Sequence, residues 1–151
     1  MVLAFESPRE RQQHRAGEGP PSLMNANSTE AWPTELRLHK GGRTLTISFD
    51  SEGAFDLPAE YLRIKSPSAE VQGHSPSERK TVPGKINVVI IEVLPVGNYA
   101  VRLVFDDMHS TGIYSWGYLL ELGRNYAAYW QDYLDELAAK NLKREPPSRK
   151  A

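Results

Sequence analysis

The stretch INVVIIEVLPVGNYAVRLVFDD, which begins at Ile86, constrains the fold more than any other part of the sequence. Its first part, residues 87–94, is an almost continuous apolar run, which is typical of a strand buried on both faces. After the turn residues 95–98, large apolar side chains alternate with other residues, at Tyr99, Val101, Leu103 and Phe105. We therefore predict two paired strands and expect the first to lie in the centre of its sheet.

A second hairpin precedes this pair in the sequence. The segment TELRLHKGGRTLTISFD, which starts at Thr34, alternates apolar and polar residues on both sides of a Gly41-Gly42 turn. The following segment, EGAFDLPAEYLRIKS, changes to a short helical spacing that directs Tyr61, Leu62 and Ile64 inward.

From Trp116 onward the apolar residues recur every three or four positions, as in an amphipathic helix, and Gly123 divides this region into a short and a longer helix. The inward positions are Leu119, Leu122, Tyr126, Tyr129 or Trp130, Tyr133 and Leu137. The order of these elements predicts an α+β fold, in which a small, mostly antiparallel sheet is backed by a short helix and a C-terminal helix.

Three regions differ in composition. Residues 1–30 contain few large apolar side chains, so they cannot offset an ordering entropy of roughly 1–2 kcal/mol per residue, and we predict that they are disordered. Residues 31–142 form the predicted domain. Residues 143–151 are basic and contain two prolines, and we predict a flexible tail.

The composition narrows the function. The net charge of −1 offers no field that would attract nucleic acid or an anionic membrane. The chain of 151 residues has no cysteine, no apolar run long enough to span a bilayer and no signal-peptide pattern, so we expect a cytoplasmic protein.

Polar residues that could carry chemistry gather in two places, Ser66 to His74 and Asp106 to Thr111. Serine hydrolysis is disfavoured because no G-x-S-x-G elbow is present, and Ser-Pro-Ser is typical of a turn. A zinc or iron site is an alternative, with no diagnostic spacing. Its nitrogen and oxygen ligands would be His109, His74, Asp106 and Glu70.

The aromatic residues of the C-terminal helix have two interpretations. Their helical spacing is typical of a core, but four of them exceed what one sheet face can cover, which favours a partner or homodimer surface as the alternative. Stacking of nucleic-acid bases would require a basic groove around these rings, whereas this face carries the acidic residues Asp132, Asp135 and Glu136. We therefore expect no nucleic acid and no membrane as partners.

Two phrases, YLRIKSPSAEVQGH and VGNYAVRLVFDDMHSTGIYSWGYL, resemble a family of small bacterial proteins of unknown function. That family is similar to the N-terminal domain of gamma-butyrobetaine hydroxylase and trimethyllysine hydroxylase, and a comparable domain is fused to iron–sulfur scaffold proteins of the Mrp/ApbC type. The resemblance covers about Leu36 to Leu122 and implies a small α+β domain. The catalytic domain of the hydroxylases has no counterpart in this chain.

In the hydroxylases, three cysteines of the matching loop and a downstream histidine hold a structural zinc. The resemblance places these ligands at Ser66, Ser68, Val71 and His109, which implies a vestigial zinc knuckle closed by hydrogen bonding and packing. It also implies that His109 contacts the Ser66 loop. Met108 replaces the glycine of D-D-G-H, which argues against a turn with positive φ at that position.

From these observations we expect a non-catalytic accessory or interaction domain with no cofactor. The resemblance implies a context in iron–sulfur or metallo-enzyme assembly. A histidine and carboxylate metal site is the first alternative, and an unrecognised enzyme is the second. The expected interaction surface consists of His109, Tyr114, Trp116, Tyr129 and Trp130.

Overall fold

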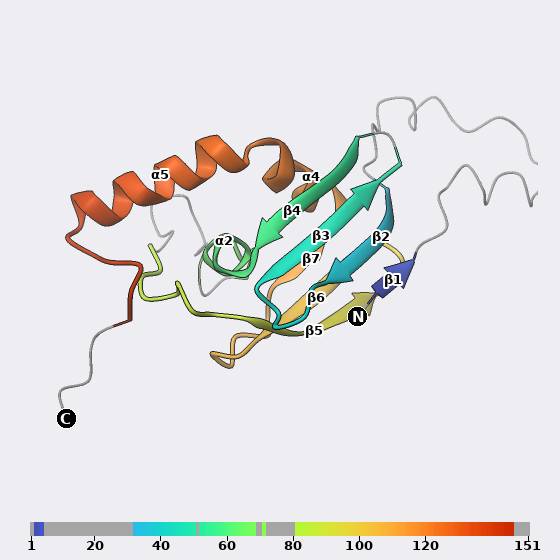
Figure 1. Cartoon of the computed structure of the whole chain (residues 1–151), viewed down its shortest axis with the longest axis horizontal. Helices are drawn as coiled ribbons and strands as arrows, with labels where there is room; N and C mark the ends of the chain where they lie inside the picture. Colours follow the sequence, from blue (N-terminus) through green and yellow to red (C-terminus); the bar gives the residue numbers. More distant parts are fainter. Residues whose placement is uncertain (1, 5–31, 51, 69–70, 72–80, 147–151) are drawn as a thin grey trace, which may run out of the picture.

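The computed structural model describes residues 2–4, 32–50, 52–68, 71 and 81–146 (Figure 1). These residues form two antiparallel sheets and three helices, an α+β fold as predicted, although the strands belong to two sheets rather than one. The first sheet has the order β1-β2-β3-β4, with β1 Val2–Ala4, β2 Pro33–Leu38, β3 Thr44–Phe49 and β4 Gly53–Pro58. The second has the order β5-β6-β7, with β5 Ile90–Val96, β6 Ala100–Phe105 and β7 Ile113–Ser115. The helices are α2 Ala59–Ile64, α4 Trp116–Arg124 and α5 Tyr126–Ala139.

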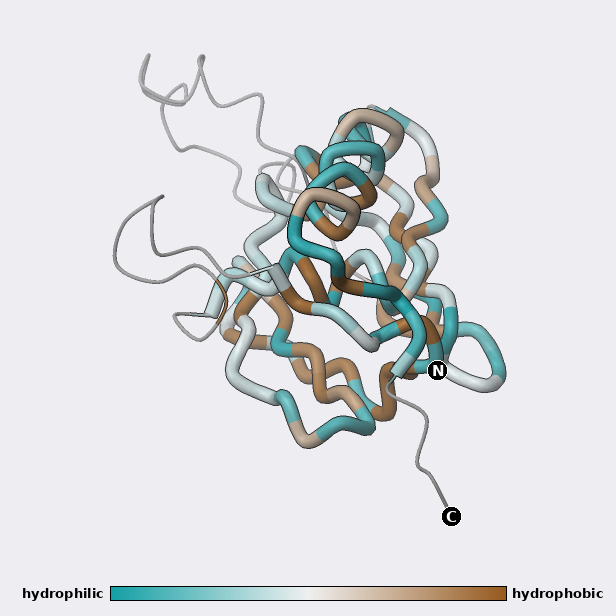
Figure 2. The backbone as a smooth tube through the Cα atoms, turned by 90° about the vertical axis from the view of Figure 1, so that its left-hand side faces the viewer, coloured by the Kyte–Doolittle hydropathy of each residue, from teal (hydrophilic) through white to brown (hydrophobic). Residues whose placement is uncertain are grey.

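A single hydrophobic core joins both sheets and the helices. In Figure 1, strands β5 to β7 lie behind β1 to β4, and in Figure 2 several hydrophobic stretches of the backbone lie close to one another. Every second residue of a strand points to the same face of its sheet, so the apolar residues that alternate along a strand point together into the core. The core contains residues from all three parts of the fold: Leu36, Leu45, Ile47, Leu57, Tyr61, Leu62, Ile64, Val93, Val101, Leu103, Phe105, Leu119, Leu122, Tyr133 and Leu137.

The predicted hairpin of β2 and β3 is present. Gly41 and Gly42 have φ of 91° and 73°, a conformation that glycine adopts without steric cost. Gly42 also connects the two sheets, because its carbonyl accepts a hydrogen bond from the N–H of Ile90 at 2.8 Å. A Cβ atom at Gly42 would lie 2.2 Å from the carbonyl oxygen of Ile90, so no other residue fits.

The segment before α2 differs from its prediction. Residues 53–58 form strand β4, which pairs with β3 along its whole length, and the helix begins only at Ala59. Phe55 and Leu57 pair with Ile47 and Leu45, so the apolar positions of this stretch continue the face of the first sheet. Tyr61, Leu62 and Ile64 of α2 are buried, as predicted.

The position of β5 also differs. The prediction that it is central is wrong, because β5 lies at the edge and β6 is the middle strand. A register shift between Ile90 and Glu92 places Ile90 and Val93 in the core and leaves Ile91 exposed. The apolar run is therefore not buried on both faces, and Tyr99 belongs to the exposed turn rather than to β6.

The C-terminal helical region is divided into a short and a longer helix as predicted, but the break lies at Asn125, and Gly123 lies within α4. Helix α4 begins after Ser115, whose Oγ accepts a hydrogen bond from the N–H of Tyr118 at 3.2 Å, and it ends at Arg124 before the Asn125 cap. Gly123 serves packing as well, since a Cβ atom there would lie 2.7 Å from the Phe55 ring.

Parts of the two terminal segments are ordered. Within the segment predicted to be disordered, Val2–Ala4 pair with β2, and residues 5–30 lie outside the described part of the chain. At the other end, two residues of the predicted flexible tail, Lys143 and Arg144, contact the domain: their carbonyl groups accept hydrogen bonds from the N–H groups of Gly84 and Ile86. Arg144 also forms two hydrogen bonds with the buried carboxylate of Glu60, at 2.7 and 2.9 Å. Residues 147–151 lie outside the described residues.

Candidate functional site

Ser66 and His109 form the centre of the candidate site. Ser66 follows α2 directly, and His109 lies in the connection between β6 and β7. Ser66 Oγ lies 2.8 Å from His109 Nε2, and Ser68 Oγ lies 3.4 Å from the same nitrogen. The predicted contact between the two segments is therefore present, across 43 residues of sequence. Ser66 is 0% exposed and His109 is 5% exposed, so these polar groups are hydrogen-bonded within the protein.

The loop after α2 is closed by its own hydrogen bonds. The backbone N–H of Ser66 donates to the carbonyl of Arg63, and the N–H of Ser68 donates to Ser66 Oγ at 3.4 Å. The N–H of Val71 donates to the carbonyl of Ser68 at 3.1 Å, and the Val71 side chain is buried. Packing and hydrogen bonding thus hold all three loop positions that the resemblance assigns to ligands.

Gly112 and Tyr114 close the site from β7. A Cβ atom at Gly112 would lie 2.3 Å from Ser66 Oγ, so the Ser66 loop packs directly on this glycine. The Tyr114 hydroxyl donates to the carbonyl of Leu62 at 2.5 Å and is hydrogen-bonded to the Ser66 side chain. Burial raises the pKa of Tyr114 far above its ordinary value, so the phenol stays protonated. Sequence reasoning missed Gly112, because nothing local shows which segment approaches a glycine.

Met108 sets the turn that presents His109. Its φ is 71°, so the positive-φ turn is kept although the residue is not glycine, contrary to the expectation from the sequence. The turn is closed by the N–H of Phe105, which donates to the carbonyl of His109 at 2.9 Å. A positive φ is strained for a residue with a side chain, and the Met108 side chain, which is 91% exposed, contributes little packing that would offset this strain.

Asp107 connects the turn to α2 and to the loop before β5. Its Oδ2 accepts hydrogen bonds from Arg63 Nε at 2.8 Å and Lys85 Nζ at 2.6 Å, and its Oδ1 accepts from the N–H of His109 at 3.1 Å. Burial alone would raise the pKa of Asp107, but the hydrogen bonds from Lys85, Arg63 and His109 outweigh it and lower the pKa to about 2. The carboxylate therefore stays charged at neutral pH.

Residues 36–120, which include the whole site, match the family described as gamma-butyrobetaine hydroxylase-like, N-terminal. The chain belongs to this family. The Ser66 loop and His109 both lie within the matched residues. No match was found among the curated proteins.

Solved structures of similar proteins support the same assignment. Two proteins with NMR solution structures are 45% and 44% identical to this chain, each with a TM-score of 0.68. The similarity covers 79% and 89% of this chain and 94% and 96% of theirs. A crystal structure of a protein of unknown function from Acidithiobacillus ferrooxidans, of the DUF971 family, is 36% identical, with a TM-score of 0.51. That similarity covers 60% of this chain and 91% of the other.

The four residues of the metal alternative are only partly placed by the structure. His109 is buried against the two serines, whereas Asp106 is exposed and its Oδ1 accepts from the N–H of Val89 at 3.0 Å. His74 and Glu70 lie outside the described residues. Within the described part of the chain, no group of three or more His, Asp or Glu side chains could hold a metal ion.

The interaction surface expected from the sequence needs correction. His109, Tyr114 and Trp116 are all buried, and the indole Nε1 of Trp116 donates to the carbonyl of Asn98 at 2.9 Å. Tyr129 and Trp130 are half-buried. Trp130 packs against the rings of Tyr61, Tyr126 and Tyr133 and lies under the Arg144 guanidinium. The aromatic stripe therefore belongs mainly to the core, the first of its two interpretations.

Large apolar residues are exposed elsewhere, mainly around the second sheet. Ile91, Tyr99, Met108 and Ile113 are exposed. Leu94, Arg102 and Ile113 lie in one row across β5, β6 and β7, on the face opposite the buried Val93, Val101, Leu103 and Tyr114. The corresponding row of the first sheet is Arg37, Thr46 and Asp56, which is polar. The two outward faces therefore differ in chemistry.

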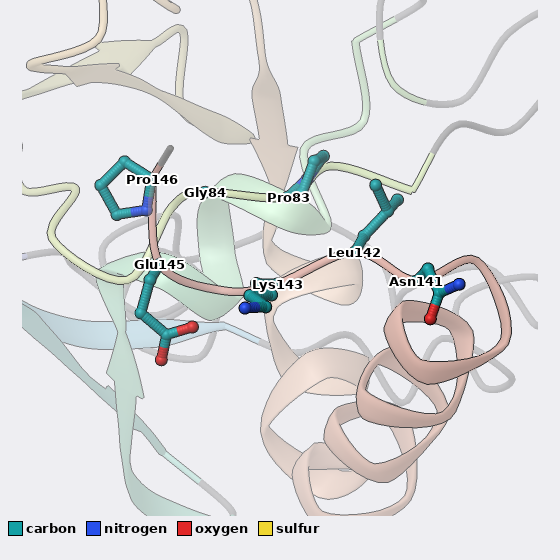
Figure 3. A pocket seen from close by; sticks show the side chains of 7 residues that line it. All are labelled: Pro83, Gly84, Asn141, Leu142, Lys143, Glu145 and Pro146. Atoms are coloured by element: carbon teal, nitrogen blue, oxygen red, sulfur yellow. The ribbon is translucent and has the colours of Figure 1, made fainter. Parts of the chain in front are cut away.

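A shallow hollow lies between the loop before β5 and the C-terminal segment (Figure 3). It is lined by Pro83, Gly84, Asn141, Leu142, Lys143, Glu145 and Pro146. Its lining combines prolines and a leucine with one cation and one carboxylate, and it includes none of the residues of the Ser66 and His109 site. No helix among the described residues is long and apolar enough to cross a membrane.

Proposed function

We propose that this chain is a non-catalytic accessory protein that works by binding another protein. The observation that carries the proposal is the burial of the site itself: Ser66 and His109 hydrogen-bond to each other inside the domain. In this proposal the site stabilises the domain and the surface binds the partner.

The geometry of the Ser66 and His109 pair disfavours nucleophilic catalysis. A serine nucleophile must reach its substrate, and its base must be oriented by a third group, typically a carboxylate on the far ring nitrogen. Ser66 is fully buried, and the Asp107 carboxylate accepts from the backbone N–H of His109. Gly112 and Tyr114 occupy the remaining side of the hydroxyl. No space is left where a reacting carbonyl could approach Ser66 Oγ.

The same geometry supports the interpretation as a vestigial zinc knuckle. Three of its four positions, Ser66, Ser68 and Val71, carry side chains that are poor ligands for zinc or cannot bind it. The two serines instead converge on His109 Nε2, and Val71 packs into the interior. We propose that hydrogen bonds replace the metal crosslink, so that the protein folds with no zinc or iron.

The outward face of the second sheet is the proposed binding surface. Apolar residues normally point inward on a sheet that has one solvated face. Ile113 is 46% exposed, Leu94 and Val104 are half-buried on the same face, and Ile91 and Tyr99 are exposed at its margins. Arg102 and Glu92 lie among them and would fix the orientation of a partner. A cytoplasmic setting and a role in iron–sulfur or metallo-enzyme assembly belong to the same proposal. The first rests on the sequence composition, and the second rests on the resemblance.

Affinity capture from the native host tests the proposal, using the full chain and two variants. Ile113→Glu places a charge on the proposed surface, and Ala54→Glu is the matched control, since Ala54 is exposed on β4 of the first sheet. We expect one protein to be retained by the wild type and by Ala54→Glu, and to be lost with Ile113→Glu. That protein should then bind the purified wild type directly. Equal capture by all three forms would contradict the proposed surface, and turnover of a substrate by the purified chain would contradict the non-catalytic role.

A further inference from the structure

Three charged side chains meet beside the Ser66 and His109 site, and their charges do not balance. Arg63 of α2 and Lys85 of the loop before β5 both donate to the same oxygen, Oδ2 of Asp107, at 2.8 and 2.6 Å. The side chains of Arg63, Lys85 and Asp107 are 11%, 23% and 18% exposed, respectively. Within the described residues, two cations therefore share one carboxylate in a poorly solvated place, and these three side chains together carry a net charge of +1.

One nitrogen of Arg63 also lacks an acceptor. Its Nε donates to Asp107, but its buried Nη1 has no hydrogen-bond partner within the described part of the chain. Among the residues that the structure describes, it is the only buried side-chain nitrogen or oxygen in this condition. A buried donor without an acceptor costs about 1–3 kcal/mol, and more when it is charged, so such a group in a native protein requires an explanation.

One ligand would correct both defects. An oxyanion would supply the missing acceptor to Nη1 and neutralise the excess charge, and the planar guanidinium is suited to oxyanions because its N–H groups form a fork. A water molecule would satisfy the donor but would leave the charge in excess. We propose that Arg63 and Lys85 form a binding site for a phosphate or carboxylate oxyanion, with Asp107 positioning both cations.

The position of the site suggests how a ligand enters and what it affects. Lys85 is the most exposed of the three residues, and its long, flexible side chain can move to admit an anion to Arg63. The same Asp107 holds the N–H of His109, and the N–H of Ser66 donates to the carbonyl of Arg63. An oxyanion bound here would therefore contact residues that hold Ser66 and His109 in place. Its binding should change the NMR shifts of the segments around Arg63 and His109.

Titration of the full chain with inorganic phosphate tests this site. The measurements are calorimetry and the NMR shifts of the Arg63 and His109 amides, with chloride at equal ionic strength as the reference. We expect saturable binding that Lys85→Met weakens by about tenfold or more, because one charged hydrogen-bond partner is lost. Lys143→Met is the matched control, since Lys143 is an exposed lysine outside the cluster, and it should bind as the wild type does.

Asp107→Asn distinguishes a binding site from a cluster that only stabilises the fold. It removes the negative charge that competes with the ligand, so the folded protein should be less stable but should bind phosphate more tightly than the wild type. Arg63→Lys keeps the charge and removes the fork, and should weaken binding even where the fold is retained. The circular dichroism of each variant shows that it is folded before its affinity is compared.

Acetate and an acidic peptide, titrated in the same way, distinguish the sources of the oxyanion. Tighter binding of the peptide than of phosphate would identify a carboxylate of a polypeptide, and the reverse would identify a free phosphate group. The proposal is overturned if phosphate, acetate and the peptide all fail to bind the folded wild type. It is also overturned if Lys85→Met and Lys143→Met bind equally, which would show an adventitious ion only. Neither result depends on whether the outer face of the second sheet binds a partner.

Discussion

Replacing Ser66 with alanine is the most direct test of the hydrogen bonds that close the candidate site. The substitution removes one oxygen atom, which lies 2.8 Å from His109 Nε2 and accepts the N–H of Ser68 at 3.4 Å. The same hydroxyl is hydrogen-bonded to the Tyr114 phenol. Because Ser66 is fully buried, water cannot replace the missing oxygen without moving the loop.

The expected loss follows from these contacts. After the substitution, His109 Nε2 keeps its contact with Ser68 Oγ, but the distance of 3.4 Å is long for a hydrogen bond. A buried polar group whose partner is removed costs about 1–3 kcal/mol. We therefore expect Ser66→Ala to lower the free energy of unfolding by about 2 kcal/mol. With a typical slope of about 2 kcal/mol per molar urea, the midpoint of unfolding should fall by about 1 M.

Two further variants identify the cause of this loss. Ser68→Ala removes the weaker, 3.4 Å contact and should cost about 1 kcal/mol or less. His109→Phe removes the imidazole, so that Ser66→Ala in this background no longer leaves a ring nitrogen without its partner. The double-mutant cycle should then show a coupling energy of about 1–2 kcal/mol between Ser66 and His109. Equilibrium unfolding in urea, followed by tryptophan fluorescence and circular dichroism, measures the wild type and the four variants.

A small effect would refute the reasoning. If Ser66→Ala costs less than about 0.5 kcal/mol, the hydroxyl does not support His109, and the closed loop is held by packing alone. If the losses of Ser66→Ala and His109→Phe simply add, the two residues stabilise the domain independently. Either result would remove the physical basis for a knuckle closed by hydrogen bonds.

Four other outcomes can be checked by unfolding measurements on the full chain. Met108→Gly should raise the free energy of unfolding by about 0.5 kcal/mol, because relief of strain at the φ of 71° exceeds the entropy that glycine adds to the unfolded chain. Met108→Ala should not raise the free energy of unfolding. Leu103→Ala should lower the free energy of unfolding by about 2–5 kcal/mol, but Ile91→Ala at the exposed edge should lower it by less than about 0.5 kcal/mol. Equal losses at the two positions would contradict the assigned core. The pKa of Asp107 is about 2 in the folded protein, below its ordinary value of 3.8, so its contribution to stability is complete above pH about 4 and is lost toward pH 2. Asp107→Asn should therefore remove up to about 2 kcal/mol of this dependence of the unfolding free energy on pH. EDTA should leave the thermal midpoint unchanged, and a fall of about 10 °C that zinc or iron restores would support the metal alternative.

The parts of the fold that follow from local patterns could be predicted. Alternating residues on both sides of Gly41-Gly42 indicated the β2 and β3 hairpin, and the three-to-four spacing after Trp116 indicated α4 and α5. The contact between Ser66 and His109 is different, because 43 residues separate the two and no local pattern connects them. It could be expected only from the resemblance, which implied that these two segments lie next to each other.

The errors arise where tertiary contacts override a local rule. A run of apolar residues cannot distinguish an edge strand from a central one, and the register shift at Ile90 and Glu92 turns Ile91 outward. A preference against positive φ predicts an ordinary conformation at Met108, but the hydrogen bond between Phe105 and His109 requires the tight turn. Charge composition indicated a loose tail, yet Arg144 pairs with a buried glutamate that lies 84 positions earlier.

Val71 is the loop position at which the proposed vestigial zinc knuckle differs most from a metal site. The resemblance assigns a metal ligand to this position, and the structure places a buried apolar side chain there, between residues 69–70 and 72–80 that lie outside the description. Burial of a valine contributes about 1.5–3 kcal/mol and each net hydrogen bond about 0.5–1.5 kcal/mol, whereas a structural zinc contributes about 10–16 kcal/mol. A loop held in this way is weaker than a metal-bound one, so its stability depends on the neighbours that it contacts. Those neighbours are Gly112, Tyr114 and, through Arg63, the Asp107 cluster, and an oxyanion bound to that cluster would therefore act on the loop as well as on its own cations.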